Sequence, residues 1–388
     1  MIEYMESLKY NNKITIPKED IMAVSNVYYT NMRTTLQENL LQKLERLVKK
    51  AGMMDIDFNN KYTAIKIHFG EPGNLAYLRP NYSKVLVDLI KAQNGRVFLT
   101  DCNTLYVGRR KNALDHLDAA YENGYNPFTT GCHMIIADGL KGTDDVLVPI
   151  DGEYVKEAKI GRAIMDADVF ITLSHFKGHE ATGFGGALKN IGMGCGSRAG
   201  KMEMHNAGKP YVEQENCIGC GRCIKICAHD APSITDGKAS IDHDKCVGCG
   251  RCIGVCPMDA VCTPGDESND ILNRKIAEYS KAVVTGRPHF HISLVVDVSP
   301  NCDCHSENDI PIVPDVGMFA SFDPVALDVA CADAVNKQPV ISGSQLDRMP
   351  HVHHDHFIDS APETNWHSCI EHAVKIGLGS DQYELIEI

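Results

Sequence analysis

The first half of the chain alternates short apolar runs with amphipathic stretches. The apolar runs, each about as long as one strand, are residues 21–28, 62–68, 96–99, 133–137 and 168–173. The amphipathic stretches between them are residues 36–50, 83–93 and 112–123. Strands that alternate with helices favour an α/β fold, with a mostly parallel sheet covered by helices on both faces.

The same alternation returns in the last third of the chain, with helices expected at 271–284, 324–335 and 366–377 and a strand at 291–298. We therefore expect one discontinuous α/β domain, residues 21–208 and 264–388, with residues 209–263 inserted into one of its loops. Three consecutive domains are the alternative. It is weaker because the C-terminal part contains few strands of its own.

The inserted stretch contains eight cysteines in two repeats, CIGCGRCIKIC and CVGCGRCIGVC. Their spacing is typical of a bacterial ferredoxin with two [4Fe-4S] clusters, in which the fourth cysteine of each repeat crosses to the other cluster. We expect one cluster on Cys217, Cys220, Cys223 and Cys256. The other is expected on Cys246, Cys249, Cys252 and Cys227.

Zinc sites and disulfides are the alternatives for these cysteines. A structural zinc ion takes four ligands, usually from two pairs, and would leave the third cysteine of each repeat idle. Disulfides are disfavoured because the sequence shows no secretory signal. Ala228 follows Cys227, whereas Pro257 follows Cys256. Proline supplies no ligand, so this departure leaves the cluster assignment unchanged.

Polar side chains gather directly after four of the expected strands. The groups are Lys66, His68 and Glu71; Asp101, Cys102 and Asn103; Ser174 to His179; and Asp297 with Cys302, Asp303, Cys304 and His305. Each group alone could cap a helix or solvate a loop. Together they favour a shared cleft, because parallel strands end at one edge of a sheet. The candidate catalytic residues in that cleft are His68, Glu71, Asp101, His175 and His179.

A glycine-rich run, residues 182–196, follows the third of these groups. It lacks the P-loop core and fits no dinucleotide fingerprint. It is either an anion site or a tight structural turn. The candidate anion-binding residues are Lys66, Lys177, Gly183, Gly185, Gly186 and Lys189. We expect His68, Glu71, His175 and His179 to surround a pocket lined by residues 183–186, with Cys302 and Cys304 on the same side.

Composition narrows the choice of partners. The formal net charge of −13 argues against nucleic acid, and no apolar run is long enough to cross a membrane. We expect a cytoplasmic protein of an anaerobe, with a soluble electron donor or acceptor and an anionic small molecule as partners. The histidine-rich stretch 351–356 is either a metal site or, more in keeping with its composition, a polar loop.

Several long motifs carry a family resemblance. They are KIHFGEPGN (66–74), LTDCNTLYVGRR (99–110), SHFKGHEATGFGGALKNIGMGCGSRAGK (174–201), VSPNCDCHSENDIP (298–311) and FDPVALDVACAD (322–333). With the cysteine repeats, they resemble the domain of unknown function 362 family and, more narrowly, its "uncharacterised Fe-S center protein" branch. The resemblance begins near Ile21. It implies an α/β domain with a two-cluster ferredoxin module and identifies no reaction.

Three functions remain open at this point. The first is a redox enzyme in which the two clusters relay single electrons to the cleft. The second is a non-catalytic electron carrier or docking protein. The third is a metal-handling or cofactor-assembly protein that uses the cysteine and histidine loops. A concave pocket favours the first, a flat polar surface the second, and a closed cage of thiolates and imidazoles the third.

Overall fold

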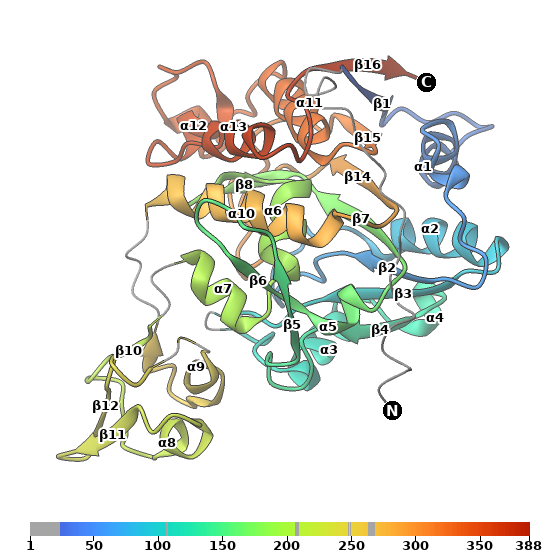
Figure 1. Cartoon of the computed structure of the whole chain (residues 1–388). Coiled ribbons are helices and arrows are strands. Elements are labelled where there is room, and N and C mark those ends of the chain that lie inside the picture. The colour runs from blue at the N-terminus through green and yellow to red at the C-terminus, as the bar shows by residue number, and fades with distance from the viewer. Residues whose placement is uncertain (1–23, 106–107, 206–208, 247, 249, 263–267) are drawn as a thin grey trace.

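The computed structural model describes residues 24–105, 108–205, 209–246, 248, 250–262 and 268–388. Within these residues an eight-stranded sheet forms the centre of the molecule (Figure 1). Across the sheet the strands are β16 (Tyr383–Glu387), β1 (Ser25–Asn31), β15 (Gly317–Ser321), β14 (His289–Val295), β7 (Val169–His175), β2 (Tyr62–Lys66), β3 (Arg96–Asp101) and β4 (His133–Ile136).

The sheet is mixed but mostly parallel. Strand β15 pairs antiparallel with both β1 and β14, while every other described pair in the sheet is parallel. The chain runs outward from β2 through β3 to β4 and then returns to β7 on the other side of β2. The strand order therefore reverses between β2 and β7, which is where open α/β sheets place their ligands.

Helices cover both faces of the sheet. One face carries α1 (Leu40–Lys50), α2 (Pro80–Ala92), α3 (Ala113–Glu122) and α4 (Pro127–Thr130). The other carries α5 (Arg162–Met165), α6 (Ala187–Cys195), α10 (Asn269–Val284), α11 (Pro324–Asn336) and α13 (His367–Lys375). Successive strand residues alternate between two apolar clusters; Ala64 belongs to one and Ile65 to the other. The predicted α/β architecture with both faces covered is confirmed.

Some elements differ from those expected from the sequence. Strands β15 and β16 and the hairpin of β5 (Asp145–Pro149) and β6 (Glu157–Gly161) were not predicted. The glycine-rich run is neither an open loop nor a single turn: it forms β9 (Gly183–Gly185), which pairs with β8 (Lys177–His179), and then helix α6. Glycine is required inside α6 because a side chain at Gly192 would collide with the carbonyl of Ile276 in α10.

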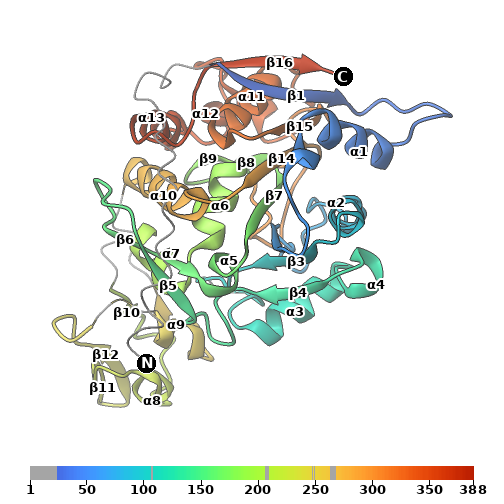
Figure 2. The same ribbon diagram turned by 45° about the vertical axis from the view of Figure 1, so that its right-hand side comes forward.

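The cysteine-rich segment is a small compact unit. It contains β10 (Tyr211–Val212), α8 (Arg222–Ile226), β11 (Pro232–Thr235), β12 (Lys238–Ile241), α9 (Arg251–Val255) and β13 (Val261–Cys262). Strands β10 and β13 pair with each other, as do β11 and β12. Figures 1 and 2 both show this unit at one end of the α/β body, with α9 toward α7 (Arg198–His205) and α8 farther out.

The remaining short elements are η1 (Met53–Asp55), η2 (Leu346–Arg348) and α12 (His356–Ser360). Among the described helices, none combines the length and the apolar character needed to cross a bilayer. Residues 21–23 of the first predicted strand, Cys249, and residues 263–267 at the end of the cysteine-rich segment lie outside the described residues.

Candidate functional site

A cavity of about 390 Å³ lies at the carboxyl edge of the sheet, beside the reversal between β2 and β7. All four polar groups that follow separate strands contribute to its wall. The wall residues from these groups are Lys66, His68, Asp101, Cys102, His175, Lys177, His179, Cys302, Cys304 and His305. The structure therefore brings the four groups to one concave site, of a size that suits a small ligand.

At the end of β2, Lys66 is fully buried and forms an ion pair. Its Nζ lies 2.9 Å from Oδ1 of Asp101 and donates a hydrogen bond of 2.7 Å to Oδ1 of Asn190. Burial raises the pKa of Asp101, but the positive charge of Lys66, together with that of His116, Lys201 and Arg110, outweighs burial and leaves that pKa below its usual value. Asp101 therefore serves as a charged partner of Lys66 and is not an open acid or base.

Glu71 does not line the cavity; it fixes an arginine that does. Its carboxylate lies 2.7 Å from Nε of Arg110, and it accepts a second hydrogen bond from the backbone of Arg109. Nη1 of Arg110 lies 2.8 Å from Nε2 of His68. Both ring nitrogens of His68 therefore face donors, because the backbone N–H of Gly70 lies 3.0 Å from Nδ1. Burial, followed by the charge of Arg110, holds the pKa of His68 well below its usual value.

His175 lies at the end of β7 with both ring nitrogens facing oxygen atoms. Nδ1 lies 2.9 Å from Oδ1 of Asp303, and Nε2 lies 2.7 Å from the carbonyl of Val296. Carbonyls and carboxylates accept hydrogen bonds, so both ring nitrogens face acceptors. Lys177 completes the group, with Nζ 3.3 Å from Oδ2 of Asp303. His175 thus joins the loop after β14 to the end of β7.

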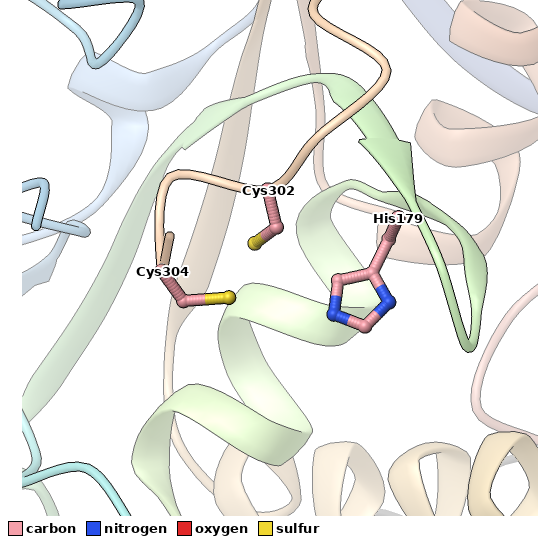
Figure 3. A group of neighbouring side chains, drawn as sticks. All are labelled: His179, Cys302 and Cys304. Atoms are coloured by element: carbon pink, nitrogen blue, oxygen red, sulfur yellow. The ribbon is translucent and has the colours of Figure 1, made fainter. Parts of the chain in front are cut away.

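His179 differs from the other histidines because it faces two thiols. Three atoms lie within 4.8 Å of one another: one ring nitrogen of His179 and the sulfurs of Cys302 and Cys304. Nδ1 of His179 accepts backbone hydrogen bonds from Ala181 at 3.0 Å and Thr182 at 3.2 Å. The other ring nitrogen is turned toward the sulfurs (Figure 3).

Lys189 of α6 lies against the two thiols. Its Nζ donates to Sγ of Cys302 at 3.4 Å. The hydrogen bond from Cys302 lowers the pKa of Cys304 to about 7, with Lys189 acting in the same direction and burial opposing it. The same hydrogen bond, together with burial, raises the pKa of Cys302 to about 12. One sulfur is therefore acidic and its neighbour remains a thiol.

The glycine-rich run contributes both backbone and side chains to the site. The N–H groups of Ala187 and Leu188, at the start of α6, donate to the carboxylate of Asp328 at 2.6 and 2.9 Å. These two donors are therefore occupied within the protein, and the proposed anion site depends on the lysine side chains. Gly185, Gly186 and Lys189 line the cavity, whereas Gly183 packs against Trp366.

Among the cavity residues that were not singled out from the sequence are Arg110, Lys201 and His205. Arg110 lies nine residues after the end of β3, and the path of the loop between them cannot be predicted from the sequence. Lys201 and His205 lie four residues apart on α7 and share one face of that helix. That i, i+4 spacing was the signal available in the sequence. Nζ of Lys201 donates to the carbonyl of Gly196 at 2.6 Å.

The cysteine-rich segment contains two further and much smaller cavities, each of about 20 Å³. One is lined by Cys217, Cys220, Cys223 and Cys256. The other is lined by Cys227, Cys246 and Cys252. The first cavity combines three cysteines of the first repeat with one of the second. The second combines two described cysteines of the second repeat with one of the first. All fifteen cysteines in the described part of the chain are free.

Backbone geometry in this segment follows the internal repeat. Gly219 and Gly221 have φ of 64° and 69°, and the matching Gly248 and Gly250 have φ of 70° and 66°. Glycine is favoured there because other residues rarely adopt this left-handed conformation. Backbone N–H groups also point at sulfur: Ala239 donates to Cys217 at 3.3 Å and Ala260 to Cys256 at 3.3 Å.

Helix α7 separates the large cavity from the cysteine-rich segment. Lys201 and His205 line the cavity, while Met202 packs in the same apolar cluster as Cys217, Cys223 and Cys252. Leu105 belongs to both regions, because it lines the cavity and joins that apolar cluster. A single layer of the protein therefore divides the two sites.

The histidine-rich stretch 351–356 is a capped turn. His353 pairs with Asp359 at 2.9 Å, and His356 begins α12 with Nε2 3.0 Å from the carbonyl of Gln338. Asp355 caps α12. Among the described residues, the group of His179, Cys302 and Cys304 alone brings three potential metal ligands together. The polar-loop interpretation of this stretch is therefore the better one.

Comparisons with known proteins place the chain in a family. Residues 63–333 match the family described as Domain of unknown function (DUF362). No curated protein matches the chain. The structure of the lactate racemase apoprotein from Thermoanaerobacterium thermosaccharolyticum is similar at 13% identity, with a TM-score of 0.35, over 72% of this chain and 52% of that one.

A crystal structure of a Thermotoga maritima protein is similar at 12% identity, with a TM-score of 0.41, over 79% of this chain and 60% of that one. The chain spans between about half and three fifths of these two solved chains. The family match extends over well more than half of the sequence, and the chain therefore belongs to the DUF362 family.

Proposed function

We propose that this protein is an iron–sulfur redox protein of the Fe-S center branch of its family. In this proposal residues 209–263 form a ferredoxin-like module with two [4Fe-4S] clusters, and single electrons pass to the cavity of the α/β domain. The observation that carries the proposal is the sorting of the cysteines. Each small cavity combines one repeat with a single cysteine of the other, as crossed ligation in two-cluster ferredoxins requires.

The residues present fit such clusters. Cys217, Cys220, Cys223 and Cys256 would hold one, and Cys246, Cys249, Cys252 and Cys227 the other. Cluster-bound sulfur is acidic and is stabilised by N–H donors. Such donors reach Cys217, Cys256 and, at 3.5 Å from His229, Cys227. Hydrogen bonds from Ala239 and Gly219 also lower the pKa of Cys217.

Bound clusters would supply single electrons at low potential. The path to the cavity leads past α7 and Leu105, whose side chain contacts both regions. An α-helix is about 10 Å across, so one helix thickness separates the module from the cavity wall. The short path supports delivery of electrons to a bound substrate.

The cavity favours an anionic substrate. Five cationic side chains, Lys66, Arg110, Lys177, Lys189 and Lys201, contribute to its wall. Ion pairs with Asp101, Glu71 and Asp303 balance the first three, which leaves Lys189 and Lys201 against the carboxylate of Glu180. In a chain with a formal charge of −13 this local excess of positive charge is specific to the site. Within the cavity wall, the two thiols lie together with His179, and Lys189 donates to Cys302.

A groove beside the module suits an acidic electron-carrier protein. Lys111, Lys141, Arg222 and Lys225 line it, together with Asp115, Asp259 and the cluster-ligand candidate Cys256. Positive charge around an electron entry point would steer a negatively charged donor to it. We propose this groove as the docking surface for a soluble, acidic donor.

Two alternatives remain as proposals. A non-catalytic carrier would need no enclosed cavity at the sheet edge, so the cavity favours the enzyme. A metal-handling role has the group of His179, Cys302 and Cys304 in its favour. The hydrogen bonds to Nδ1 of His179 count against it, because a histidine that binds metal through one nitrogen normally donates from the other.

Anaerobic purification with iron, sulfide and zinc analysis tests the proposal. We expect about eight iron and eight sulfide per chain, and a reduced EPR spectrum broadened by coupling between neighbouring clusters. Cys262 provides a matched control, because it lies in the same segment but lines neither small cavity. Cys220→Ala should lower the iron content and Cys262→Ala should not. Stoichiometric zinc, or equal losses in both variants, would reject the clusters.

A further inference from the structure

We propose that Cys302 and Cys304 form a redox-active dithiol pair in the cavity that reduces an anionic disulfide. The inference deepens the proposed function and rests on it for the source of electrons. It assigns a role to the loop after β14 and a substrate class to the cavity.

The loop geometry places the two sulfurs together. The backbone N–H of His305 donates to the carbonyl of Cys302 at 3.0 Å, which closes a turn with both cysteines in it. The neighbouring Asp303 points the other way, toward His175 and Lys177. The turn thus fixes the loop through Asp303 and leaves the two sulfurs directed into the cavity (Figure 3).

The surroundings favour sulfur anions over a resident metal cation. Nδ1 of His179 accepts two backbone hydrogen bonds, so in the neutral ring the proton is on the nitrogen that faces the sulfurs. That nitrogen then carries a proton, lies within 4.8 Å of both sulfurs and is not a metal ligand. Lys189 donates a hydrogen bond to Cys302 at 3.4 Å. Its positive charge stabilises a thiolate and would repel a divalent cation.

The two cysteines are also unequal, as an attacking and a resolving thiol need to be. Cys302 donates its hydrogen bond to Cys304, which lowers the pKa of Cys304 and raises that of Cys302. Cys302 is 1% exposed, whereas Cys304 is more accessible. Cys304 is therefore the attacking thiolate and Cys302 the resolving thiol.

The chemistry balances as a two-electron reduction. The Cys304 thiolate attacks one sulfur of the substrate, the substrate S–S bond breaks, and one half leaves as a thiolate that takes a proton. Cys302 then loses its proton and attacks the Cys304 sulfur, which releases the second half as a thiol and leaves a Cys302–Cys304 disulfide. Return to the dithiol takes two electrons, delivered singly by the reduced cluster pair of the proposed function, and two protons from solvent.

The substrate class follows from the charge of the cavity. Five lysine and arginine side chains line it, and their charges lower the pKa of nearby histidines; for His205, burial and then His179, Lys189 and Lys201 lower it to about 3. A disulfide that carries carboxylates would be held beside Lys189 and Lys201. A disulfide that carries ammonium groups would be repelled.

The test uses two disulfides of similar size and opposite charge, 3,3′-dithiodipropionate and cystamine, with the anaerobically purified full chain. Products are read by mass spectrometry of the peptide that carries Cys302, Cys304 and Cys331. We expect dithiodipropionate to convert Cys302 and Cys304 to an internal disulfide at least tenfold faster than cystamine. Cys302→Ser should trap half of the probe on Cys304, and Cys304→Ser should trap none on Cys302. Cys331→Ala, a buried cysteine in the same peptide, should behave as the unmodified protein does.

Four outcomes would overturn the inference: no internal disulfide, a trapped adduct on another cysteine, equal or faster reaction with cystamine, or a stoichiometric metal lost in both cysteine variants. The exchange with the probe needs no cluster. Protein without iron that still exchanges with dithiodipropionate would therefore reject the proposed electron source and leave the dithiol pair standing. Protein that contains about eight iron but does not exchange with dithiodipropionate would support the clusters and reject the dithiol pair.

Discussion

In the large cavity, the side chains that pair come from distant parts of the chain: His175 and Asp303 are 128 residues apart, and Lys66 and Asn190 are 124 apart. In the cysteine-rich segment, both small cavities are lined largely between Cys217 and Cys256. The first site exists because the sheet aligns strand ends, while the second follows from a local repeat. The two regions should therefore respond differently to mutation.

Removal of the cysteine-rich segment should separate the two regions most completely. If residues 209–263 are replaced by a short glycine–serine linker, we expect all cluster iron to be lost and the α/β fold to remain. The two large apolar clusters contain no residue of the segment, and the third shares Leu105 and Met202 with it. Each of these side chains would lose apolar burial that contributes about 1.5–3 kcal/mol to the free energy of unfolding. Circular dichroism and thermal unfolding measure the outcome; complete unfolding would mean that the segment is integral to the α/β domain.

Asp303→Asn should damage the cavity and leave the cysteine-rich segment intact. It removes the buried partner of His175 and Lys177, and a broken buried ion pair costs about 3–5 kcal/mol. Chemical denaturation should show this loss at pH 7 with iron content unchanged. The charges of His175 and Lys177 overcome burial and hold the pKa of Asp303 below its unfolded value. The stability from this pair is therefore full above about pH 4 and declines as the pH falls, a decline that Asp303→Asn should abolish.

Charge reversal in the groove should alter electron entry without altering stability. In Arg222→Glu with Lys225→Glu, we expect the rate of reduction by an acidic ferredoxin to fall about tenfold at low salt, and the salt dependence to flatten. Unfolding free energy should change by less than about 0.5 kcal/mol. Lys49→Glu with Lys50→Glu, which makes the same change of charge at exposed positions of α1, is the control. An equal effect from that variant would show that total charge, and not the groove, controls the rate.

Glu180→Gln should give the smallest effect. The hydrogen bond from His305 to Glu180, 2.9 Å long, raises the pKa of His305. Such a pair stabilises the fold below the unfolded histidine pKa of about 6.5, and its contribution is lost as the pH rises through the folded value. Because His305 is 41% exposed, a few tenths of a kcal/mol at most are at stake. NMR titration should show a lower His305 pKa in the variant. An unchanged value would show that Glu180 does not raise the pKa of His305.

The two regions also differ in how well the sequence predicts them. The repeat spacing of the cysteines anticipates which of them share a cavity, because cluster-binding loops are local. Strand ends anticipate that His68, His175 and His179 line one site, because parallel strands end at one edge. Both inferences use information that lies within a few residues along the chain.

What the sequence does not predict depends on long-range contacts. Nothing local indicates that Asp328 accepts hydrogen bonds from two N–H groups at the start of α6. The same holds for Glu71, which turns away from the cavity toward Arg110. Strand β15 was missed because its antiparallel pairing places it far from its partner β1 in sequence.

The most direct test of the account is the crossed ligation of the cysteine-rich segment. In Cys227→Ala, we expect about four iron per chain in place of about eight. Anaerobic alkylation followed by peptide mapping should find Cys217, Cys220 and Cys223 protected and Cys246 and Cys252 modified, because Cys227 lines the cavity of the second repeat. Protection of Cys246 and Cys252 with modification of Cys217, Cys220 and Cys223 would contradict the account.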